Sequence, residues 1–162
     1  MIICGIDPGY ATVGVAFLKY EGNKFTLLEA GAIVTKPETP YFERIEEIFD
    51  NLTQLLIKHK PDVCAVEQLF FNSNTTTAMK VAESRGAIIL AMQKQNLLIC
   101  EYTPLQVKQA VTGYGKATKA QVMEMTKTLL NLGQIPKPDD AADACAIAIT
   151  QAHCGTSLLA GV

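Results

Sequence analysis

The chain has 162 residues, of which 49% are apolar and 19% charged, and its formal net charge is −2. This length and composition predict one globular domain and exclude a chain that is disordered throughout, and the slight negative charge excludes binding to nucleic acid through overall positive charge. No apolar run is long enough to cross a bilayer and no basic stretch precedes a long apolar one, so we expect no membrane association and no secretory signal.

The first third of the chain reads as strands followed by one helix. Apolar runs predict strands over residues 2–6, 12–20 and 25–34, and the polar segment 21–23 predicts a turn between the last two. Residues 44–60 carry apolar side chains at helical spacing, and a proline follows directly. The strands therefore form an antiparallel meander, closed by an amphipathic helix.

The remainder alternates strands with helices and then becomes helical. We predict, in order, a strand over 63–66, a helix over about 76–95, a strand over 97–102, helices over 104–111 and about 118–130, and a last helix from about 138. Hairpins imply antiparallel strands and helical crossovers imply parallel ones. The expected fold is α/β: a mixed five-stranded sheet, with three antiparallel and two parallel strands, flanked by helices. Residues 1–153 form the predicted domain, and residues 154–162 are a C-terminal tail without a predicted structure.

Two acidic residues end apolar strands, where a charge is unexpected. Asp7 precedes Pro8 and Gly9, and Glu67 ends the run Val-Cys-Ala-Val-Glu. A turn-forming role also explains Asp7, but glutamate is a poor turn former. Since the ends of neighbouring strands lie side by side and crevices there bind ligands, Asp7 and Glu67 are predicted to project into one cleft.

A third acidic group opens the last helix. A favourable interaction with the helix dipole also explains Asp139 and Asp140. Asp143 shares a helix face with Asp140 and precedes a wholly apolar run, so its charge requires a partner. Clustered carboxylates take up protons unless a cation lies among them. A carboxylate-only site suits a divalent, oxygen-binding cation such as Mg²⁺, and no His or Cys cluster has zinc-ligand spacing.

Five motifs follow one another along the chain: GIDPGYATVGVA, AVEQLFF, AMKVAESRGA, TPLQVKQAVTGYGKATK and DDAADACAIAIT. Together, over residues 2 to about 153, they resemble the RuvC family of bacterial Holliday-junction resolvases, members of the ribonuclease H-like superfamily. The first motif alone is shared with other ribonuclease H-like proteins, whereas all five in this order and spacing are specific. The resemblance implies a single ribonuclease H-like nuclease domain over residues 1–153.

The resemblance also implies the reaction. The family's enzymes are crossover junction endodeoxyribonucleases, which resolve four-way (Holliday) junctions by paired, symmetric hydrolysis during recombination and DNA repair. By motif, Asp7, Glu67, Asp140 and Asp143 match the catalytic acids, which hold two Mg²⁺ ions per active site, with Mn²⁺ as a substitute. Two metals a few Å apart activate a water and stabilise the leaving oxygen of a phosphodiester.

The DNA contacts are expected in and before a basic segment. Residues 80–127 contain seven basic and three acidic side chains, a pattern that ordinary solvated helix faces also explain. By resemblance, Lys108 and Lys119 match lysines near the scissile phosphate, and Phe70 matches the aromatic residue that opens the junction. Lys116 and Arg85 are further candidates for binding DNA.

A two-fold symmetric junction needs two nicks, so the resemblance implies a homodimer. The helix over about 76–95, with Ala82, Gly86 and Ile88, is the candidate interface. The family also implies cooperation with a branch-migration complex of RuvA and RuvB. Five cysteines without a C-x-x-C pair predict reduced thiols and a cytoplasmic location.

Three other functions remain open at this point. The first is another ribonuclease H-like nuclease, acting on RNA or on other branched DNA through the same acids. The second is a nucleotide-binding module of the actin and sugar-kinase type, which requires a second phosphate-binding loop and a longer chain. The third is an inactive DNA-binding relative, which the presence of all four acids disfavours.

Overall fold

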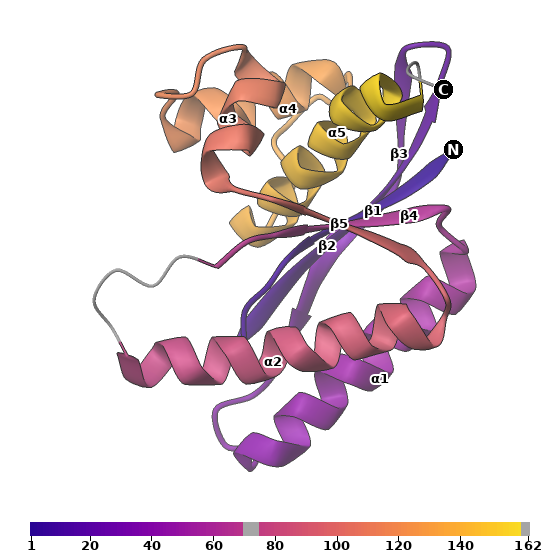
Figure 1. Cartoon of the computed structure of the whole chain (residues 1–162). Helices are drawn as coiled ribbons and strands as arrows, with labels where there is room; N and C mark the ends of the chain where they lie inside the picture. The colour runs from indigo at the N-terminus through magenta and orange to yellow at the C-terminus, as the bar shows by residue number, and fades with distance from the viewer. Residues whose placement is uncertain (70–74, 160–162) are drawn as a thin grey trace.

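The computed structural model describes residues 1–69 and 75–159. One five-stranded sheet, in the order β3-β2-β1-β4-β5, lies between two layers of helices (Figure 1). The strands are β1 (Ile2–Asp7), β2 (Thr12–Glu21), β3 (Lys24–Val34), β4 (Val63–Glu67) and β5 (Leu98–Tyr102). β1, β2 and β3 pair antiparallel, whereas β4 is parallel to both β1 and β5. The predicted α/β fold with a mixed sheet is therefore confirmed.

Helices cover both faces of this sheet. They are α1 (Tyr41–His59), α2 (Thr75–Lys94), α3 (Pro104–Thr112), α4 (Lys119–Leu129) and α5 (Asp139–Leu159). α1 and α2 pack on one face, and α3, α4 and α5 on the other (Figure 1). Within the described ranges, no helix combines the length and the apolar character that crossing a membrane requires.

Local sequence explains where the elements begin and end. Gly22 and Asn23 have φ of +56° and +62°, the backbone of a tight hairpin turn between β2 and β3. Thr103 and Thr118 each form a capping box at the start of α3 and α4. α1 begins three residues before the predicted start, because its apolar pattern is clear only beyond its first turn. α5 continues through the backbone of Leu159, past residue 153.

Side-chain alternation divides the core into two halves. On β1, Ile3 packs toward α5 and Ile6 packs toward α1 and α2. On β4, Ala65 and Val66 divide in the same way. Since successive side chains on a strand point to opposite faces, the residue after Ile6 and the residue after Val66 both point toward α5.

Candidate active site

Asp7 and Glu67 occupy equivalent positions on neighbouring strands. Ile6 pairs with Val66 in the parallel ladder of β1 and β4, and each acid is the next residue along its strand. Both side chains therefore leave the sheet on the α5 face, at the edge where these parallel strands end. The predicted convergence of the two strand ends follows from this register.

α5 brings its first turns to the same edge. A Cβ atom on Gly14, which pairs with Asp7, would lie 2.0 Å from the backbone oxygen of Asp140. A Cβ atom on Gly5 would lie 2.1 Å from the backbone oxygen of Ala144. Only glycine allows the helix backbone to lie this close to β1 and β2. These two glycines therefore place the N-terminal end of α5 directly over Asp7.

Electrostatics show that the four acids form one group. The pKa of Asp7 is raised to about 7, first by burial and then by the nearby charges of Glu67, Asp143 and Asp140, against a lowering effect of Lys119. Burial and Asp143 also raise the pKa of Glu67. Near neutral pH the site therefore carries more negative charge than its own surroundings compensate.

Lys119 is the basic residue closest to this charge. It starts α4, and its Nζ donates a hydrogen bond to Oδ2 of Asp143 at 2.7 Å. This bond, together with the charges of Asp143, Asp139 and Asp7, raises the pKa of Lys119. The neighbouring Asp139 instead faces outward and pairs with Lys137 at 3.0 Å. Asp140 and Asp143, rather than Asp139, are therefore the members of α5 that act on Asp7 most strongly.

The donor set fits a hard divalent cation, because it consists of four carboxylates, of which only Asp143 has a positively charged partner among the described residues. In residues 1–69 and 75–159, however, no three His, Cys, Asp or Glu side chains already converge on one point as metal ligands. The carboxylates are thus close enough to raise the pKa of Asp7, but they do not point at one shared position. Asp143 instead forms an ion pair with Lys119.

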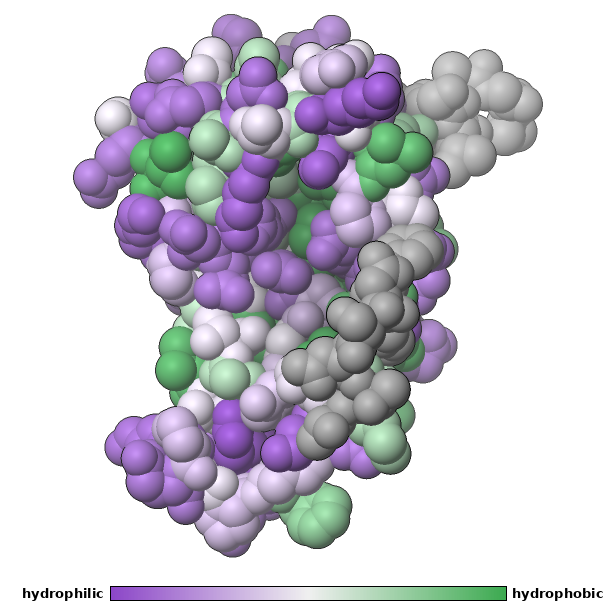
Figure 2. Space-filling model, turned by 90° about the vertical axis from the view of Figure 1, so that its left-hand side faces the viewer, coloured by the Kyte–Doolittle hydropathy of each residue, from purple (hydrophilic) through white to green (hydrophobic). Residues whose placement is uncertain are grey.

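The other predicted contact residues lie on several elements. Lys108 is half-buried on α3, and Lys116 is exposed in the loop between α3 and α4. Arg85 lies on α2, on the opposite face of the sheet, and forms an ion pair with Glu101. Phe70 lies outside the described residues. Figure 2 looks onto the end of the sheet that carries the acids, and hydrophilic residues cover most of the half formed by α3, α4 and α5.

Sequence reasoning missed the residues that brace the loop after Asp7. The buried hydroxyl of Ser84 on α2 donates to the Gly9 carbonyl at 2.5 Å. Buried Arg44 donates through Nε to Oγ1 of Thr35 at 2.8 Å, and Thr35 donates to the Tyr10 carbonyl at 2.8 Å. Ser84 and Arg44 fall on the buried sides of their helices, and a buried polar group needs a partner. A polar residue on the buried side of a predicted helix was therefore the feature of the sequence that could have revealed them.

The strand order, with acids at the ends of β1 and β4 and at the start of α5, defines an α/β protein of the ribonuclease H-like class. Within this class, the family model for the crossover junction endodeoxyribonuclease RuvC matches residues 3–151, so the chain belongs to the RuvC family. The resemblance inferred from the five motifs is thereby confirmed.

Individual relatives agree with this assignment. The crossover junction endodeoxyribonuclease RuvC of Alkaliphilus metalliredigens is 54% identical over 155 residues, which cover 96% of this chain and 94% of the relative. The structure of Thermus thermophilus RuvC is 35% identical, covers 97% of this chain and 96% of that one, and superposes with a TM-score of 0.91. The same protein in complex with a Holliday junction substrate is 34% identical with the same coverage and a TM-score of 0.92.

Proposed function

We propose that the chain is a Mg²⁺-dependent endonuclease that resolves four-way DNA junctions by paired, symmetric hydrolysis of phosphodiester bonds. The observation that carries the proposal is the position of Asp7 beside three other carboxylates, which together with burial raise its pKa to about 7, in a family of crossover junction endodeoxyribonucleases. Such a group suits a reaction in which cations neutralise a phosphate and its attacking and leaving oxygens.

We assign the ligands of two Mg²⁺ ions to Asp7, Glu67, Asp140 and Asp143, with Mn²⁺ as a substitute. When bound, the ions supply an activated water and stabilise the leaving oxygen. Asp7 ends a core strand and Gly14 holds α5 beside it, so the chain fixes both carboxylate-bearing backbones before any ligand binds. A cation bound beside Asp7 would favour the charged form of this carboxyl, whose pKa is raised to about 7 in its absence.

Basic residues on the same side of the sheet are assigned to the DNA backbone. Lys119 is pre-positioned beside the acids by Asp143, and Lys108 and Lys116 lie on α3 and in the loop that precedes α4. We keep Arg85 as a weaker candidate because Glu101 already engages its guanidinium group. Phe70, by resemblance alone, is the proposed junction-opening aromatic.

A homodimer is proposed through α2, with an interface that differs in part from the one expected from the sequence. Ile88 is fully buried in the core of its own chain. The exposed positions Met79, Ala82, Gly86 and Leu90 instead form a stripe at helical spacing. Met79 is 68% and Leu90 54% exposed, and a Cβ atom on Gly86 would meet no atom within 4 Å. This stripe has the small and apolar residues that close helix packing needs.

The dimer is tested by Leu90→Arg, with Ile57→Arg as a matched control, because Ile57 on α1 is 55% exposed. Sedimentation equilibrium should show a dimer for the parent and for Ile57→Arg, and a monomer for Leu90→Arg. A dimer that survives Leu90→Arg unchanged would place the interface elsewhere. We further propose a cytoplasmic location, consistent with five free cysteines, and cooperation with RuvA and RuvB.

The activity is tested by nicking assays on a synthetic four-way junction, a linear duplex and an RNA–DNA hybrid, each with and without Mg²⁺. Paired, symmetric nicks that need Mg²⁺ and occur only in the junction are expected. Cleavage of the hybrid would instead favour the alternative of a ribonuclease H-like enzyme that acts on RNA, and cleavage of other branched DNA would broaden the substrate. Binding without cleavage under every metal condition would refute the catalytic assignment.

A further inference from the structure

β3 forms an unusually unprotected edge of the sheet. The strand order places it at the end, with β2 as its hydrogen-bonded neighbour among the described strands. An irregularity in strand pairing can protect an edge by bending it, but the one in β3 lies before residue 30, opposite Phe17 and Leu18. From residue 30 to residue 34 the strand reads Ala-Gly-Ala-Ile-Val, without charge or proline. Proteins usually protect an edge with such residues, because its unpaired backbone groups can pair with another chain.

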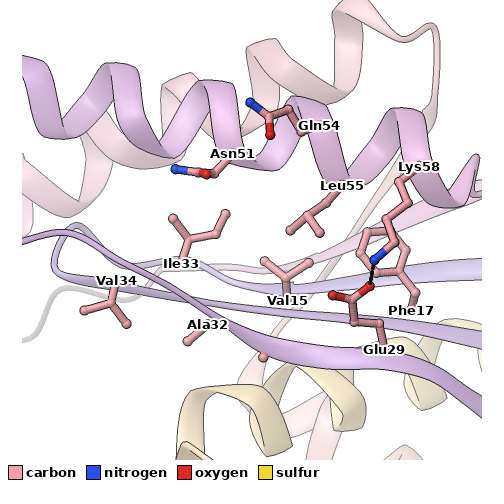
Figure 3. A pocket seen from close by; sticks show the side chains of 11 residues that line it. Val15, Phe17, Glu29, Ala32, Ile33, Val34, Asn51, Gln54, Leu55 and Lys58 are labelled. Atoms are coloured by element: carbon pink, nitrogen blue, oxygen red, sulfur yellow. Dashed lines mark hydrogen bonds and ion pairs between the residues drawn. The ribbon is translucent and has the colours of Figure 1, made fainter.

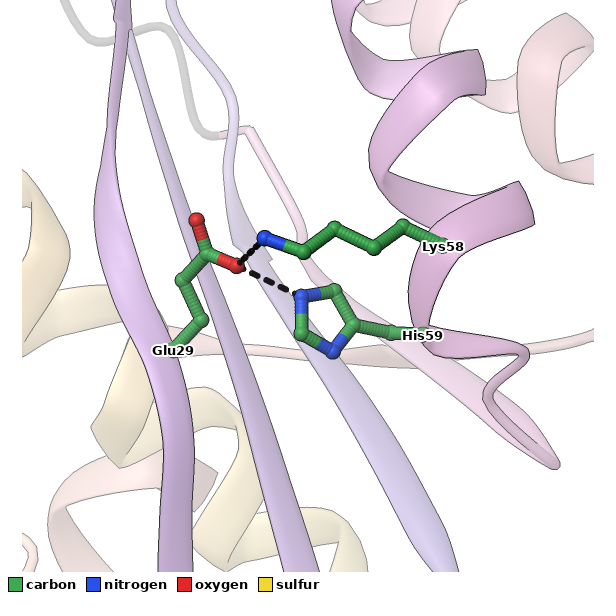
Figure 4. A network of polar contacts seen from close by, with 3 residues as sticks. All are labelled: Glu29, Lys58 and His59. Atoms are coloured by element: carbon green, nitrogen blue, oxygen red, sulfur yellow. Dashed lines mark hydrogen bonds and ion pairs between the residues drawn. The ribbon is translucent and has the colours of Figure 1, made fainter.

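Hollows lie on both faces of this edge. The hollow on the α1 side has a volume of about 450 Å³, and its apolar lining includes Val15 and Ile33 from the sheet and Leu55 from α1 (Figure 3). One end is closed by Glu29, whose Oε2 accepts from Lys58 at 2.5 Å and lies 2.6 Å from Nε2 of His59 (Figure 4). The hollow on the other face, about 630 Å³, lies between β3 and residues 132–137.

The glycine inside β3 is not required by the packing of this chain. A Cβ atom on Gly31 would meet no atom within 4 Å, whereas one on Gly5 or Gly14 would clash with the backbone of α5. Gly31 lines the hollow on the α1 side, and its φ lies outside the left-handed region. A glycine inside a strand weakens it and often marks a place where another backbone approaches closely. Gly31 therefore leaves room for something outside the chain.

The surface next to this hollow is acidic. A third hollow, on α1, is lined by the acidic residues Glu43, Glu46, Glu47 and Asp50, here called the acidic row. It shares Asn51 and Gln54 with the hollow on the α1 side of β3. The four acidic residues are exposed, and in the described residues none of them forms an ion pair. This charge repels nucleic acid and attracts a basic ligand.

We propose that β3 pairs with an extended, basic segment of a partner protein, which adds a sixth strand to the sheet. Side chains of an added strand alternate between the two faces, so aliphatic residues at alternate positions enter the two hollows. Lysine or arginine residues of the segment meet the acidic row of α1. Main-chain hydrogen bonds supply affinity, and the hollows and the acidic row supply specificity.

Charge also selects this occupant over a second copy of the chain. Pairing of two β3 edges about a two-fold axis would place the α1 helices on either side of one seam. The acidic rows of both copies would then approach each other, which costs free energy. A basic segment from another protein meets the same surface with complementary charge.

The test uses a random twelve-residue peptide library displayed on phage and selected on the full chain, with counter-selection on Gly31→Ile. A Cβ atom at this position meets no atom within 4 Å, so we expect isoleucine to extend into the hollow and to leave the fold and junction cleavage intact. Thr26→Ile is the matched control, because Thr26 is an exposed β3 residue that lines neither hollow. The charge variant is Glu46→Lys with Glu47→Lys, and its control is exposed Glu38→Lys.

Enriched peptides should alternate aliphatic residues and carry at least two basic ones. Their affinity should fall at least tenfold for Gly31→Ile and for the double lysine variant, and stay within twofold for Thr26→Ile and Glu38→Lys. N-methylation of alternate peptide amides should abolish binding in one register and be tolerated in the other, because only one set of amides faces β3. No enrichment, equal binding to Gly31→Ile, or insensitivity to N-methylation in both registers would overturn the proposal.

Discussion

On the face of the sheet covered by α5, Gly5 and Gly14 lie directly beneath helix backbone, whereas on the face covered by α1, Gly31 borders open space. The first arrangement brings backbone to backbone and fixes carboxylates over a strand end. The second leaves a hollow beside an unpaired edge. Glycine therefore allows close packing around the proposed active site on one face and borders an open hollow on the other, and the neighbouring residues determine which.

The acids on the two faces differ in the same way. Asp7 is surrounded by other carboxylates, and its pKa is raised to about 7. Glu29 on the α1 face lies against Lys58 and His59, which lower its pKa. Asp7 therefore lies among like charges, whereas Glu29 already has positively charged partners in the chain. The following variants test this contrast between the faces.

The largest effect is expected from Asp7→Asn, which keeps the shape of the side chain and removes its charge. Loss of a proposed cation ligand should lower junction cleavage by at least about 10³-fold, the equivalent of several kcal/mol of transition-state stabilisation. Junction binding, measured by fluorescence anisotropy, should change little. Glu29→Gln is the control on the opposite face and should cleave within twofold of the parent. Retained nicking by Asp7→Asn would remove Asp7 from the catalytic set.

The next effect concerns the glycines and is read as the free energy of unfolding in urea. Gly14→Val should destabilise the protein by about 3 kcal/mol or more, because its Cβ would lie 2.0 Å from the backbone of Asp140. Gly31→Val should instead be neutral or stabilising by roughly 0.5–1 kcal/mol, because valine suits a strand and meets open space. Equal destabilisation by the two variants would contradict the contrast between the faces.

The third prediction is a pH dependence in the absence of divalent cations. The folded protein keeps a proton on Asp7 up to about pH 7, whereas the unfolded chain releases it near 3.8. Between these values the unfolded state binds fewer protons, so stability falls as the pH rises, by roughly 2–4 kcal/mol. Urea unfolding in EDTA at pH 4.5 and pH 8 measures the fall.

Two comparisons separate this effect from other titrations. Asp7→Asn should lose most of the fall, and Mg²⁺ should restore stability to the parent at pH 8. The lowered pKa of Glu29 acts in the opposite sense: its contribution is present above the unfolded pKa and is lost as the pH falls. Glu29→Gln should therefore retain the decline toward pH 8. Identical pH profiles for the parent and for Asp7→Asn would disprove the origin assigned to it.

The smallest effect is expected from Lys119→Ala. Loss of one phosphate contact should lower cleavage about tenfold and reduce the slope of log affinity against log salt by about one. Lys58→Ala, which removes the cation beside Glu29 on the other face, should leave both quantities unchanged. A salt slope that is the same for the parent and for Lys119→Ala would move Lys119 out of the DNA interface.

The sequence predicted those parts of the fold that depend on local pattern. Strand alternation, the Gly22-Asn23 turn and the helical spacing of α1 gave the order of elements and the mixed sheet. The convergence of Asp7 and Glu67 followed from the rule that neighbouring parallel strands end together. Each of these inferences needs only residues close in the chain and general rules of sheet geometry.

Contacts between distant segments were not accessible in this way. The sequence around Gly14 and around Gly31 does not show which glycine lies under a helix. Gly14 packs against Asp140, more than a hundred positions away, whereas no residue of the described chain fills the space beside Gly31. For the same reason two expectations changed. Arg85 pairs with Glu101, which makes it a weaker candidate for binding DNA, and Ile88 is buried in its own chain and so leaves the proposed dimer interface. The brace from Ser84 to Gly9 spans 75 residues of sequence.

α5 carries Asp140 and Asp143 in its first turns, and its next residues are among the most deeply buried of the core. α5 therefore carries two of the four candidate catalytic acids and at the same time forms part of the core. A molecule that loses this helix, during synthesis, heating or degradation, loses Asp140 and Asp143 at the same moment. We therefore expect a partly folded copy to lack a complete site, because the helix that completes the core also supplies half of the proposed acids.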